Sequence, residues 1–250
     1  MPPLSIVILA HNEAHNIARC VQSLVNLSDD ILVIENGSMD DTAEIALQAG
    51  ARVIKTELKG YSETKNFGNR EAKHDWILSL DADEVPNELL IQSIKNLFEV
   101  QLEVNKVFAI QRKMVYCGMV LHHGSVGNEF RVRLFNRHFA KWNTNTVHEE
   151  LHFLQPKQIE QLNGFLCHYS YRSVDEHRLR LAKYAQLSAK QMFESGKQAN
   201  FTKMYCSAPF SFIKNYFLKG GFLDGIIGLQ FALNEMWYVK LKYQLLQKML

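Results

Sequence analysis

The sequence predicts an α/β fold with a mostly parallel central sheet flanked by helices and a C-terminal helical extension. Three observations support this prediction. Short apolar runs alternate with helical patterns over residues 4–80, polar clusters follow three of those runs, and lysine and aromatic residues are concentrated after residue 200. Strands that alternate with helices in this way build parallel sheets with right-handed crossovers. With 47% hydrophobic residues in a chain of 250, a sizeable core can be buried.

The first half of the chain contains four expected strands, each a short apolar run. These are residues 4–10, 30–35, 53–54 and 76–80. The first run is apolar almost throughout, which is typical of a strand that is buried on both faces of a sheet. Between the strands we expect a helix capped by Asn12, a helix that begins near Ser38 and Asp41, and a helix over residues 64–72.

The second half has a different pattern, with longer extended segments and longer helices. We expect helices over residues 89–98 and 174–192, extended segments over 106–116 and 130–136, and a loop region with glycine and histidine over 118–129. Residues 201–250 are expected to form two or more helices with a break at Gly220-Gly221. The pattern therefore suggests boundaries near residues 115 and 200.

Composition and charge exclude several classes of protein. The net charge of +2 is too balanced for a protein that binds nucleic acid with its whole surface, and we expect no nucleic-acid partner. The four cysteines are far apart and form no C-x-x-C pair, which fits reduced thiols in the cytoplasm. No signal peptide is recognisable, and lysine or glutamate interrupts every apolar run before the ~20 residues that a transmembrane helix needs. We therefore expect a cytoplasmic protein that does not span a membrane.

Polar residues follow three of the expected strands at the point where each ends. The clusters are His11-Asn12-Glu13, Glu35-Asn36-Gly37-Ser38 and Asp81-Ala82-Asp83-Glu84. Because ligands of parallel sheets bind at the carboxyl ends of the strands, we expect the three clusters to converge on one site. Each cluster alone could be simple helix capping, and a lone D-x-D could be a solvated turn. Two carboxylates one residue apart after an apolar strand are also suited to hold a divalent cation that binds a diphosphate.

Four motifs in this region resemble those of the family 2 glycosyltransferases, which have the GT-A fold. They are S-I-V-I-L-A-H-N-E (5–13), I-E-N-G-S-M-D-D-T (34–42), K-G-Y-S-E-T-K-N (59–66) and W-I-L-S-L-D-A-D-E (76–84). Shorter matches continue the likeness through R-V-R-L-F-N-R (131–137), V-H-E (147–149), C-H-Y-S (167–170) and G-G-F-L-D-G-I-I-G (220–228). The sequence looks most like the branch that adds glucose or galactose to the inner core of bacterial lipopolysaccharide.

The resemblance implies a nucleotide-sugar site with a divalent cation. The positions that match the family's nucleotide-binding residues are Ala10, Asn12, Glu13, Glu35, Lys65, Asn66 and Asp81. Glu35 would contact the uridine, at a position where the family more often has Asp. Asp81 would face the ribose and the phosphates, and Asp83 would hold Mg²⁺ or Mn²⁺.

The catalytic base is expected in the segment Val147-His148-Glu149-Glu150, because many family members use an acidic residue from the second half of the chain. Inverting transfer needs a group that accepts the proton of the acceptor hydroxyl. We expect Glu149 to be the base and His148 to orient it or to contact the diphosphate. The alternative for this segment is an exposed polar turn.

The same segment also matches H-E-x-x-H (148–152), the motif of zinc hydrolases. That alternative requires a helix which places both histidines on one face. Thr144, Thr146 and Val147 favour extended backbone instead, and Pro156 follows closely. A third alternative, a sensor that binds the sugar nucleotide without turning it over, would need Asp83 but no base.

Missing motifs narrow the expected function further. No G-x-G-x-x-G follows the first strand and no G-x-x-x-x-G-K-[S/T] occurs, which disfavours a dinucleotide dehydrogenase and a P-loop ATPase. The Q-x-x-R-W motif of processive family members is missing as well. We therefore expect a single inverting transfer of a hexose, most simply glucose from UDP-glucose, to a heptose of a lipid A–core acceptor. Another lipid-linked glycan or a protein is the alternative acceptor within the family.

This function would divide the chain into three segments. Residues 1–115 would bind the nucleotide sugar, residues 116–200 would bind the acceptor and carry the base, and residues 201–250 would form an amphipathic helical tail. Two further groups of residues, a histidine pair and three arginines, each have two alternative interpretations. His122-His123 could face the acceptor sugar or lie in a loop, and the alternating Arg131, Arg133 and Arg137 could meet phosphate on the acceptor or form a solvated edge.

The tail is expected to hold the enzyme on the cytoplasmic face of the inner membrane as a peripheral protein. Residues 201–250 contain six lysines against two acidic residues, together with eleven aromatics. Lysine attracts anionic lipid, and aromatic side chains suit the headgroup boundary. The residues that we assign to this contact are Phe210, Phe212, Phe217, Phe222, Phe231, Trp237 and Tyr238, beside Lys214, Lys219, Lys240, Lys242 and Lys248. The alternative is that these aromatics complete the core or a dimer contact.

Overall fold

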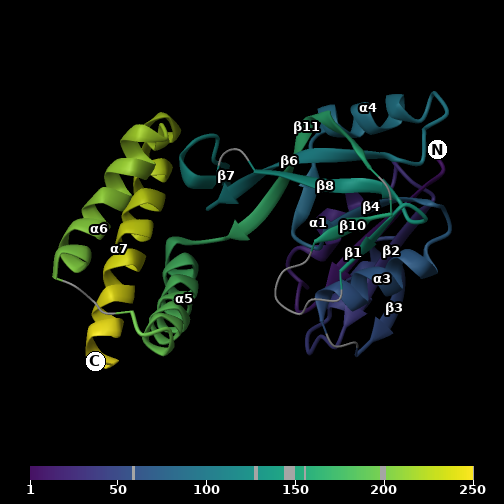
Figure 1. The fold of residues 1–250 in the computed structure, drawn as a ribbon. Helices are drawn as coiled ribbons and strands as arrows, with labels where there is room; N and C mark the ends of the chain where they lie inside the picture. The colour runs from purple at the N-terminus through teal and green to yellow at the C-terminus, as the bar shows by residue number, and fades with distance from the viewer. Residues whose placement is uncertain (58–59, 127–128, 144–149, 155, 198–200, 250) are drawn as a thin grey trace. The chain divides into compact units, whose positions relative to one another are not determined.

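A computed structural model of the chain describes residues 1–57, 60–126, 129–143, 150–154, 156–197 and 201–249. The chain forms two compact units (Figure 1). The first unit consists of residues 1–112 and 129–168, and the second of residues 113–128 and 169–250. Two strands, β6 (Lys106–Tyr116) and β11 (Gln158–Tyr171), begin in the first unit and end in the second.

The first unit contains the predicted parallel strands, in the spatial order β3-β2-β1-β4. The strands are β1 (Leu4–Ala10), β2 (Asp30–Asn36), β3 (Arg52–Thr56) and β4 (Trp76–Asp81), and they are connected by α1 (Ile17–Gln22), α2 (Thr42–Gln48) and α3 (Tyr61–Glu71). This order confirms the predicted α/β fold. Because the chain leaves β1 first toward β2 and later places β4 on its other side, the order of the strands switches at β1, where ligands of such sheets bind.

The second half of the chain extends this sheet with antiparallel strands. Strand β8 (Glu129–Asn136) pairs antiparallel with β4 and with β6, and β11 pairs antiparallel with β5 (Glu84–Pro86). Helix α4 (Glu88–Leu97) follows β5, and β9 (Ala140–Trp142) and β10 (Leu151–Phe153) form a separate antiparallel pair. The sheet is therefore mixed, with one parallel half and one antiparallel half that meet between β4 and β8.

The apolar core of the first unit lies on both faces of the sheet, as alternate residues of β1 show. Leu4, Ile6 and Ile8 belong to a cluster that includes side chains of α1 and α4, whereas Val7 and Leu9 belong to a second cluster with side chains of α3. Successive residues of a strand point to opposite faces, so a strand covered by helices on both sides must be apolar throughout. This packing explains why the first apolar run of the sequence is continuous rather than alternating.

A glycine sets the distance between α3 and the sheet. A Cβ atom at Gly68 would lie 2.6 Å from a methyl group of Val7 and 2.9 Å from a side-chain carbon of Ile34, closer than real Cβ contacts allow. Only glycine therefore fits at this position without displacing Val7, Ile34 or α3. The close approach brings the amino-terminal half of α3, which carries Lys65 and Asn66, to the carboxyl edge of the sheet.

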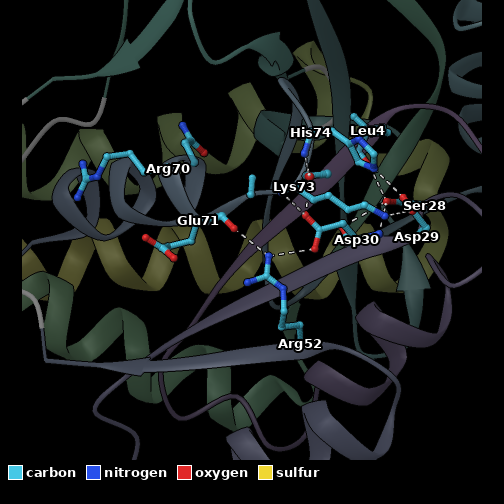
Figure 2. Close-up of polar contacts among 12 residues, drawn as sticks. Leu4, Ser28, Asp29, Asp30, Arg52, Arg70, Glu71, Lys73 and His74 are labelled. Atoms are coloured by element: carbon cyan, nitrogen blue, oxygen red, sulfur yellow. Dashed lines mark hydrogen bonds and ion pairs between the residues drawn. The ribbon is translucent and has the colours of Figure 1, made fainter.

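The amino edge of the sheet is held by a polar network around Asp30 (Figure 2). The carboxylate of Asp30 accepts hydrogen bonds from Ser5 Oγ at 2.5 Å and from the backbone N–H of Lys73 at 2.7 Å, and it pairs with Arg52 at 3.1 Å. Burial alone would raise the pKa of Asp30, but these three donors outweigh it and lower the pKa. The network connects β1, β2 and β3 to the turn before β4.

The loops that follow β1 and β2 differ from the sequence prediction at two helix starts. Helix α1 begins after Asn16, and no side chain caps α1 or α2. Asn12 instead adopts a left-handed backbone conformation with φ of 55°, and its side-chain oxygen accepts a hydrogen bond from Met39 N at 2.9 Å. The hydroxyl of Ser38 accepts one from Asn12 N at 2.9 Å. The predicted caps at Asn12 and Ser38 are wrong because both side chains connect the two loops to each other.

The second unit is mainly helical. It contains α5 (Val174–Glu194), α6 (Phe201–Ile213) and α7 (Gly225–Met249), with α7 packed against both α5 and α6 (Figure 1). The short strand β7 (Met119–Val120) pairs with the end of β6 inside this unit, and a 3₁₀ turn, η1 (Gly124–Val126), follows it. The predicted break at Gly220-Gly221 is confirmed: a π-helical turn, η2 (Lys214–Leu218), and a 3₁₀ turn, η3 (Gly221–Asp224), separate α6 from α7.

The core of the second unit corrects one prediction about the tail. Phe231 is buried with Tyr116 and Leu121, and its ring stacks on that of His177 with centroids 5.2 Å apart. Phe231 therefore serves the core and is not available to a membrane. No helix in the described part of the chain is long and apolar enough to cross a membrane.

Candidate active site

The carboxyl ends of three parallel strands lie next to one another, as the sequence predicted. In the register of the sheet, Ala10 of β1 pairs with Glu35 of β2, and Leu9 of β1 pairs with Asp81 of β4. Neighbouring strands are ~4.8 Å apart, so Glu35 and Asp81 flank the end of β1 on its two sides. The backbone of Ala10 is buried between them.

The side chains of the first two clusters make hydrogen bonds within and between the loops that follow β1 and β2. The carboxylate of Glu35 is buried and accepts a hydrogen bond from the backbone N–H of Ser38. Glu13 accepts a hydrogen bond from Asn16 Nδ2 at 2.8 Å, whereas Asn12 is exposed at the surface. These contacts fix the shape of the loops after β1 and β2 and leave Asn12 at the rim.

Asp81 is held between two cations at the end of β4. Its Oδ2 lies 2.7 Å from Arg133 Nη2 and its Oδ1 lies 3.3 Å from Lys65 Nζ. Burial alone would raise the pKa of Asp81, but the charges of Arg133 and Lys65 dominate and hold the pKa well below the usual range of a carboxyl group. Asp81 is therefore ionised at any physiological pH, and its orientation is fixed by both partners.

A second carboxylate, that of Glu84, contacts both Arg133 and the backbone of Asp81. Glu84 has no exposed surface, and its Oε1 lies 2.6 Å from the same Arg133 Nη2, while its Oε2 accepts a hydrogen bond from Asp81 N at 3.1 Å. Burial raises the pKa of Glu84, against the opposing charge of Arg133. The pKa of Arg133 is raised in turn by Asp81 and Glu84, which outweigh its own burial. One buried guanidinium thus connects two carboxylates of the D-A-D-E turn.

Helix α3 connects this network to β9. Lys65 Nζ lies 4.7 Å from the centre of the Trp142 ring, which is within the range of cation–π attraction. The next residue, Asn66, donates from Nδ2 to Trp142 O at 2.9 Å and accepts from Trp142 N at 3.0 Å. The side chain of Asn66 therefore binds Trp142 as a neighbouring strand would, and it fixes the indole ring beside Lys65.

Asp83 faces a histidine that the sequence analysis had not assigned. Asp83 Oδ2 lies 3.0 Å from Nε2 of His168, and strand pairing places His168 opposite Glu84. The Asp83 side chain is partly exposed, at 18%. Carboxylate and imidazole groups are both ligands for divalent first-row metals, and Mg²⁺ or Mn²⁺ sites commonly have one or two protein ligands plus phosphate oxygens.

These donors fit a cation that is shared with a ligand rather than enclosed by protein. In the part of the chain that the structure describes, no group of three or more His, Cys, Asp or Glu residues is placed to hold a metal ion. Asp83 and His168 supply two donors at most, so phosphate oxygens would have to complete the coordination.

A cavity of about 570 Å³ lies next to Asp81 in the first unit. Its walls come from α3, β4, β6, β8, β9 and β10 and from the segments on either side of β10. The residues that line it are Lys65, Asp81, Arg112, Arg131, Val132, Arg133, Trp142, Glu150, Leu151, Phe153 and Lys157. Five of these are basic, which suits a ligand that carries negative charge.

The predicted base and its neighbour, Glu149 and His148, lie outside the described residues. Glu150 is described and lines the cavity. The H-E-x-x-H alternative requires a helix through residue 152, but His152 belongs to strand β10 and pairs with Lys141 of β9. The structure therefore contradicts the zinc-hydrolase hypothesis, since a strand does not place residues four apart as a helix does.

The sequence predicts no specific role for three residues that the site brings together: Glu84, Arg133 and His168. Glu84 is only part of the third polar cluster, and Arg133 is left open between contact with acceptor phosphate and a solvated edge. Arg131 and Arg133 are two positions apart on β8 and therefore point to the same face of the sheet, so the sequence pattern did not distinguish their environments. Arg133 points into the network, whereas Arg131 is exposed and pairs with Glu129. For His168 the signal was the motif C-H-Y-S, whose histidine had been matched without a role.

Known glycosyltransferases resemble the chain over most of its length. Residues 5–156 match the model of "Glycosyl transferase family 2". The chain is 32% identical over 247 residues to an uncharacterized glycosyltransferase, RP128, of Rickettsia prowazekii, with 91% of this chain and 83% of that protein aligned. It is 27% identical over 243 residues to the lipopolysaccharide core biosynthesis glycosyltransferase LpsC of Rhizobium meliloti, over 92% of this chain and 89% of that protein.

A solved structure that resembles the chain is glucosyl-3-phosphoglycerate synthase of Mycobacterium tuberculosis, in a complex with Mn²⁺, UDP-glucose and phosphoglyceric acid. The identity is 26%, the alignment covers 46% of this chain and 44% of that one, and the TM-score is 0.37. At this score the likeness supports no argument about the site.

Proposed function

Since the chain belongs to the family 2 glycosyltransferases, we propose that it is an inverting, non-processive enzyme that transfers one hexose from a nucleotide donor to a heptose of the lipopolysaccharide inner core. The proposed donor is UDP-glucose. The observation that carries this proposal is the carboxylate pair Asp81 and Asp83 at the end of β4, with Asp81 fixed by Lys65 and Arg133 beside a cavity of about 570 Å³.

The nucleotide is proposed to bind over the ends of β1, β2 and β4. The buried Glu35 carboxylate offers a hydrogen-bond acceptor for the uracil ring, and Asp81 offers one for the ribose. Lys65 and Arg133 hold Asp81 in place, and they also supply positive charge where the diphosphate would lie. Preformed charges of this kind stabilise the negative charge that develops on a leaving diphosphate.

Asp83 and His168 are the residues that would hold Mg²⁺ or Mn²⁺. The cation would neutralise charge on the diphosphate and so make it a better leaving group. The contact of 3.0 Å between Asp83 Oδ2 and His168 Nε2 brings both donors to one point, and it places them at the same edge of the sheet as Asp81.

The chemical step proposed here is a direct displacement. The acceptor hydroxyl oxygen forms a bond to the anomeric carbon, the bond between that carbon and the diphosphate oxygen breaks, and its electron pair leaves with UDP. The proton of the hydroxyl goes to the carboxylate of Glu149, with His148 in an orienting role. Inversion follows because attack and departure take place on opposite faces of the sugar.

The acceptor is proposed from the similarity to LpsC, whose name assigns it to lipopolysaccharide core biosynthesis. A lipid A–core acceptor would place the enzyme at the cytoplasmic face of the inner membrane, as a peripheral protein. Another lipid-linked glycan or a protein acceptor would leave the donor chemistry unchanged.

Two variants test this function with purified protein. Asp83→Ala should abolish transfer and weaken UDP binding in the presence of Mn²⁺, and EDTA should reproduce the effect on the wild type. Asp29→Asn is the matched control, because Asp29 lies at the amino edge of the sheet, paired with His74. An Asp83→Ala enzyme with normal UDP affinity and turnover would contradict the proposed cation site.

The second variant, Glu149→Gln, separates a catalyst from a sensor of sugar nucleotides. A catalyst should lose turnover while its UDP affinity, measured by calorimetry, stays unchanged. A sensor would show no donor turnover in the wild type either, and the substitution would change nothing.

A further inference from the structure

The connection between α6 and α7, together with the adjoining ends of both helices, exposes several large apolar side chains. Six of them, at least 48% exposed each, lie within seventeen residues: Phe210, Phe217, Leu218, Phe222, Leu223 and Ile226. Leu218 and Ile226 are the most exposed, at 72% and 71%. We call these six residues the apolar tip. Large contiguous apolar surfaces on a folded protein mark sites of interaction.

The apolar tip is a folded structure, and its exposure does not come from a frayed end. Gly220 has a φ of 72°, and a Cβ atom at Gly221 would lie 2.7 Å from Asn215 O, so the reversal of the chain depends on glycine at these positions. Gly124 N donates to Lys219 O at 2.9 Å. The two turns are therefore fixed against the loop that follows β7, within the second unit.

Asp224 provides the main attachment of the apolar tip. Its side chain is 7% exposed, and Oδ2 accepts hydrogen bonds from the backbone N–H groups of His122 and His123 at 3.1 and 2.9 Å. Oδ1 also lies 3.0 Å from His123 Nδ1. This carboxylate therefore points inward and holds the turn. It also gives His122-His123 a structural role within this unit.

The exposed charges beside the apolar tip are positive. Residues 205–223 contain no Asp or Glu, and the two lysines of this stretch, Lys214 and Lys219, are exposed. Since Asp224 is turned inward, the outer surface of the tip combines apolar and aromatic side chains with lysine. Protein interfaces tend to exclude lysine, whereas the boundary of an anionic bilayer attracts both lysine and aromatic groups.

We propose that the apolar tip inserts into the headgroup region of a bilayer that contains anionic lipid, with Lys214 and Lys219 at the lipid phosphates. This inference deepens the proposed function and rests on it in one respect only, that the sugar acceptor is a lipid. The sequence had assigned the contact to lysines along the whole tail, including Lys240 and Lys248 on α7. The six residues of the apolar tip instead lie within seven positions of Lys214 or Lys219 along the chain.

Vesicle flotation with the full-length chain tests the proposal. The vesicles consist of phosphatidylcholine alone or of phosphatidylcholine with phosphatidylglycerol. The wild type should float only with the anionic vesicles, and less so at high salt. Lys214→Glu with Lys219→Glu should lower the partition coefficient at least about tenfold, because each lysine near an anionic surface contributes on the order of a factor of five. Leu218→Ser with Ile226→Ser should lower it by about tenfold or more, because buried leucine and isoleucine contribute strongly to membrane binding.

Matched controls exist in the same unit. Leu179→Ser with Leu187→Ser removes two α5 side chains that are 68% and 64% exposed, and Lys240→Glu with Lys248→Glu reverses two exposed lysines of α7. Both control pairs should leave flotation unchanged. Circular dichroism and UDP affinity should be the same for all four variants, since none of these residues belongs to the donor site.

Three results would overturn the proposal. The first is that the wild type does not bind anionic vesicles at low salt. The second is that Lys240→Glu with Lys248→Glu abolishes flotation while the variants of the apolar tip still float. The third is that sedimentation shows a dimer that Leu218→Ser with Ile226→Ser dissociates. A failure of the proposed function looks different. A protein that floats with anionic vesicles but turns over no UDP-glucose would keep the membrane contact and contradict the donor chemistry.

Discussion

Arg133→Met removes the only described guanidinium within 3 Å of both Asp81 and Glu84, and we expect it to destabilise the fold strongly. Arg133 Nη2 lies 2.7 Å from Asp81 and 2.6 Å from Glu84, and Glu84 has no exposed surface. Loss of one partner of a buried ion pair costs about 3–5 kcal/mol, because the remaining charge stays buried without compensation. We take the lower end, about 3 kcal/mol, because Asp81 is partly exposed and keeps Lys65, and because Arg112 Nη1 remains 3.6 Å from Glu84 Oε1.

The expected change in melting temperature follows from the size of the protein. For domains of 150–250 residues, 1 kcal/mol lowers Tm by roughly 2–4 °C, so Arg133→Met should lower Tm by about 6–12 °C. Arg131→Met is the matched control on the same strand, because Arg131 is exposed and pairs with Glu129 at the surface. That control should change stability by less than about 0.5 kcal/mol.

The pH dependence of Arg133→Met provides an independent check. Without the guanidinium, burial should raise the pKa of Glu84 further above its unfolded value. A group with a raised folded pKa contributes stability below its unfolded pKa, about 4.3, and loses it as the pH rises through the folded pKa. The loss of Tm should therefore be larger at neutral pH than at acidic pH.

The double variant Arg133→Met with Glu84→Gln decides whether this explanation is correct. Replacement of the carboxyl group by an amide removes the uncompensated charge, so the double variant should regain about 1–2 kcal/mol relative to Arg133→Met alone. Differential scanning fluorimetry across pH measures all of these quantities. A double variant no more stable than the single one, or an Arg133→Met protein with an unchanged Tm, would refute the reasoning.

Three other variants test separate parts of the structure. Glu35→Ala should raise the donor KM more than it lowers kcat and should weaken the preference for UDP-glucose over GDP-glucose; equal use of both by the wild type would contradict the uridine assignment. Asp30→Asn should lower the free energy of unfolding by about 2 kcal/mol, because it removes a charge-assisted network. Because the pKa of Asp30 is lowered in the fold, its stabilising contribution is present above about pH 4 and is lost on acidification. The stabilities of variant and wild type should therefore converge in acid. Burial raises the pKa of Tyr116 to about 12. An ultraviolet titration should show a late phenolate near that pH that Tyr116→Phe removes, and roughly 2–3 kcal/mol of stability should be lost between about pH 10 and pH 12.

The parallel half of the fold was predictable because its signals are local. Each of its strands is an apolar run, because a strand covered by helices on both faces is apolar at every position rather than at every second one. The position of Asp81 follows directly, since a polar residue after such a run must lie at the edge of the sheet. The same argument predicted that the clusters around Glu35 and Asp81 would converge on one site.

The remainder depended on contacts between distant parts of the chain. Arg133 meets Asp81 only because β8 pairs antiparallel with β4, and no local pattern indicates which strand will occupy that edge. The pairing of Asp83 with His168 likewise requires that β11 lie beside β5. In the tail, composition could not show that Phe231 is buried and Phe217 exposed, because the packing of the helices against one another decides which side chains are covered.

The most direct test of the proposed function is a single-turnover assay with UDP-[¹⁴C]glucose and purified lipid A–core truncated before its first hexose. We expect that label moves to the acceptor in a 1:1 ratio with released UDP and that the product gains one hexose in a β-linkage to heptose. EDTA should stop the reaction. Release of UDP with free glucose as the product, or tight UDP binding without any transfer to this or another lipid-linked acceptor, would contradict the proposed function.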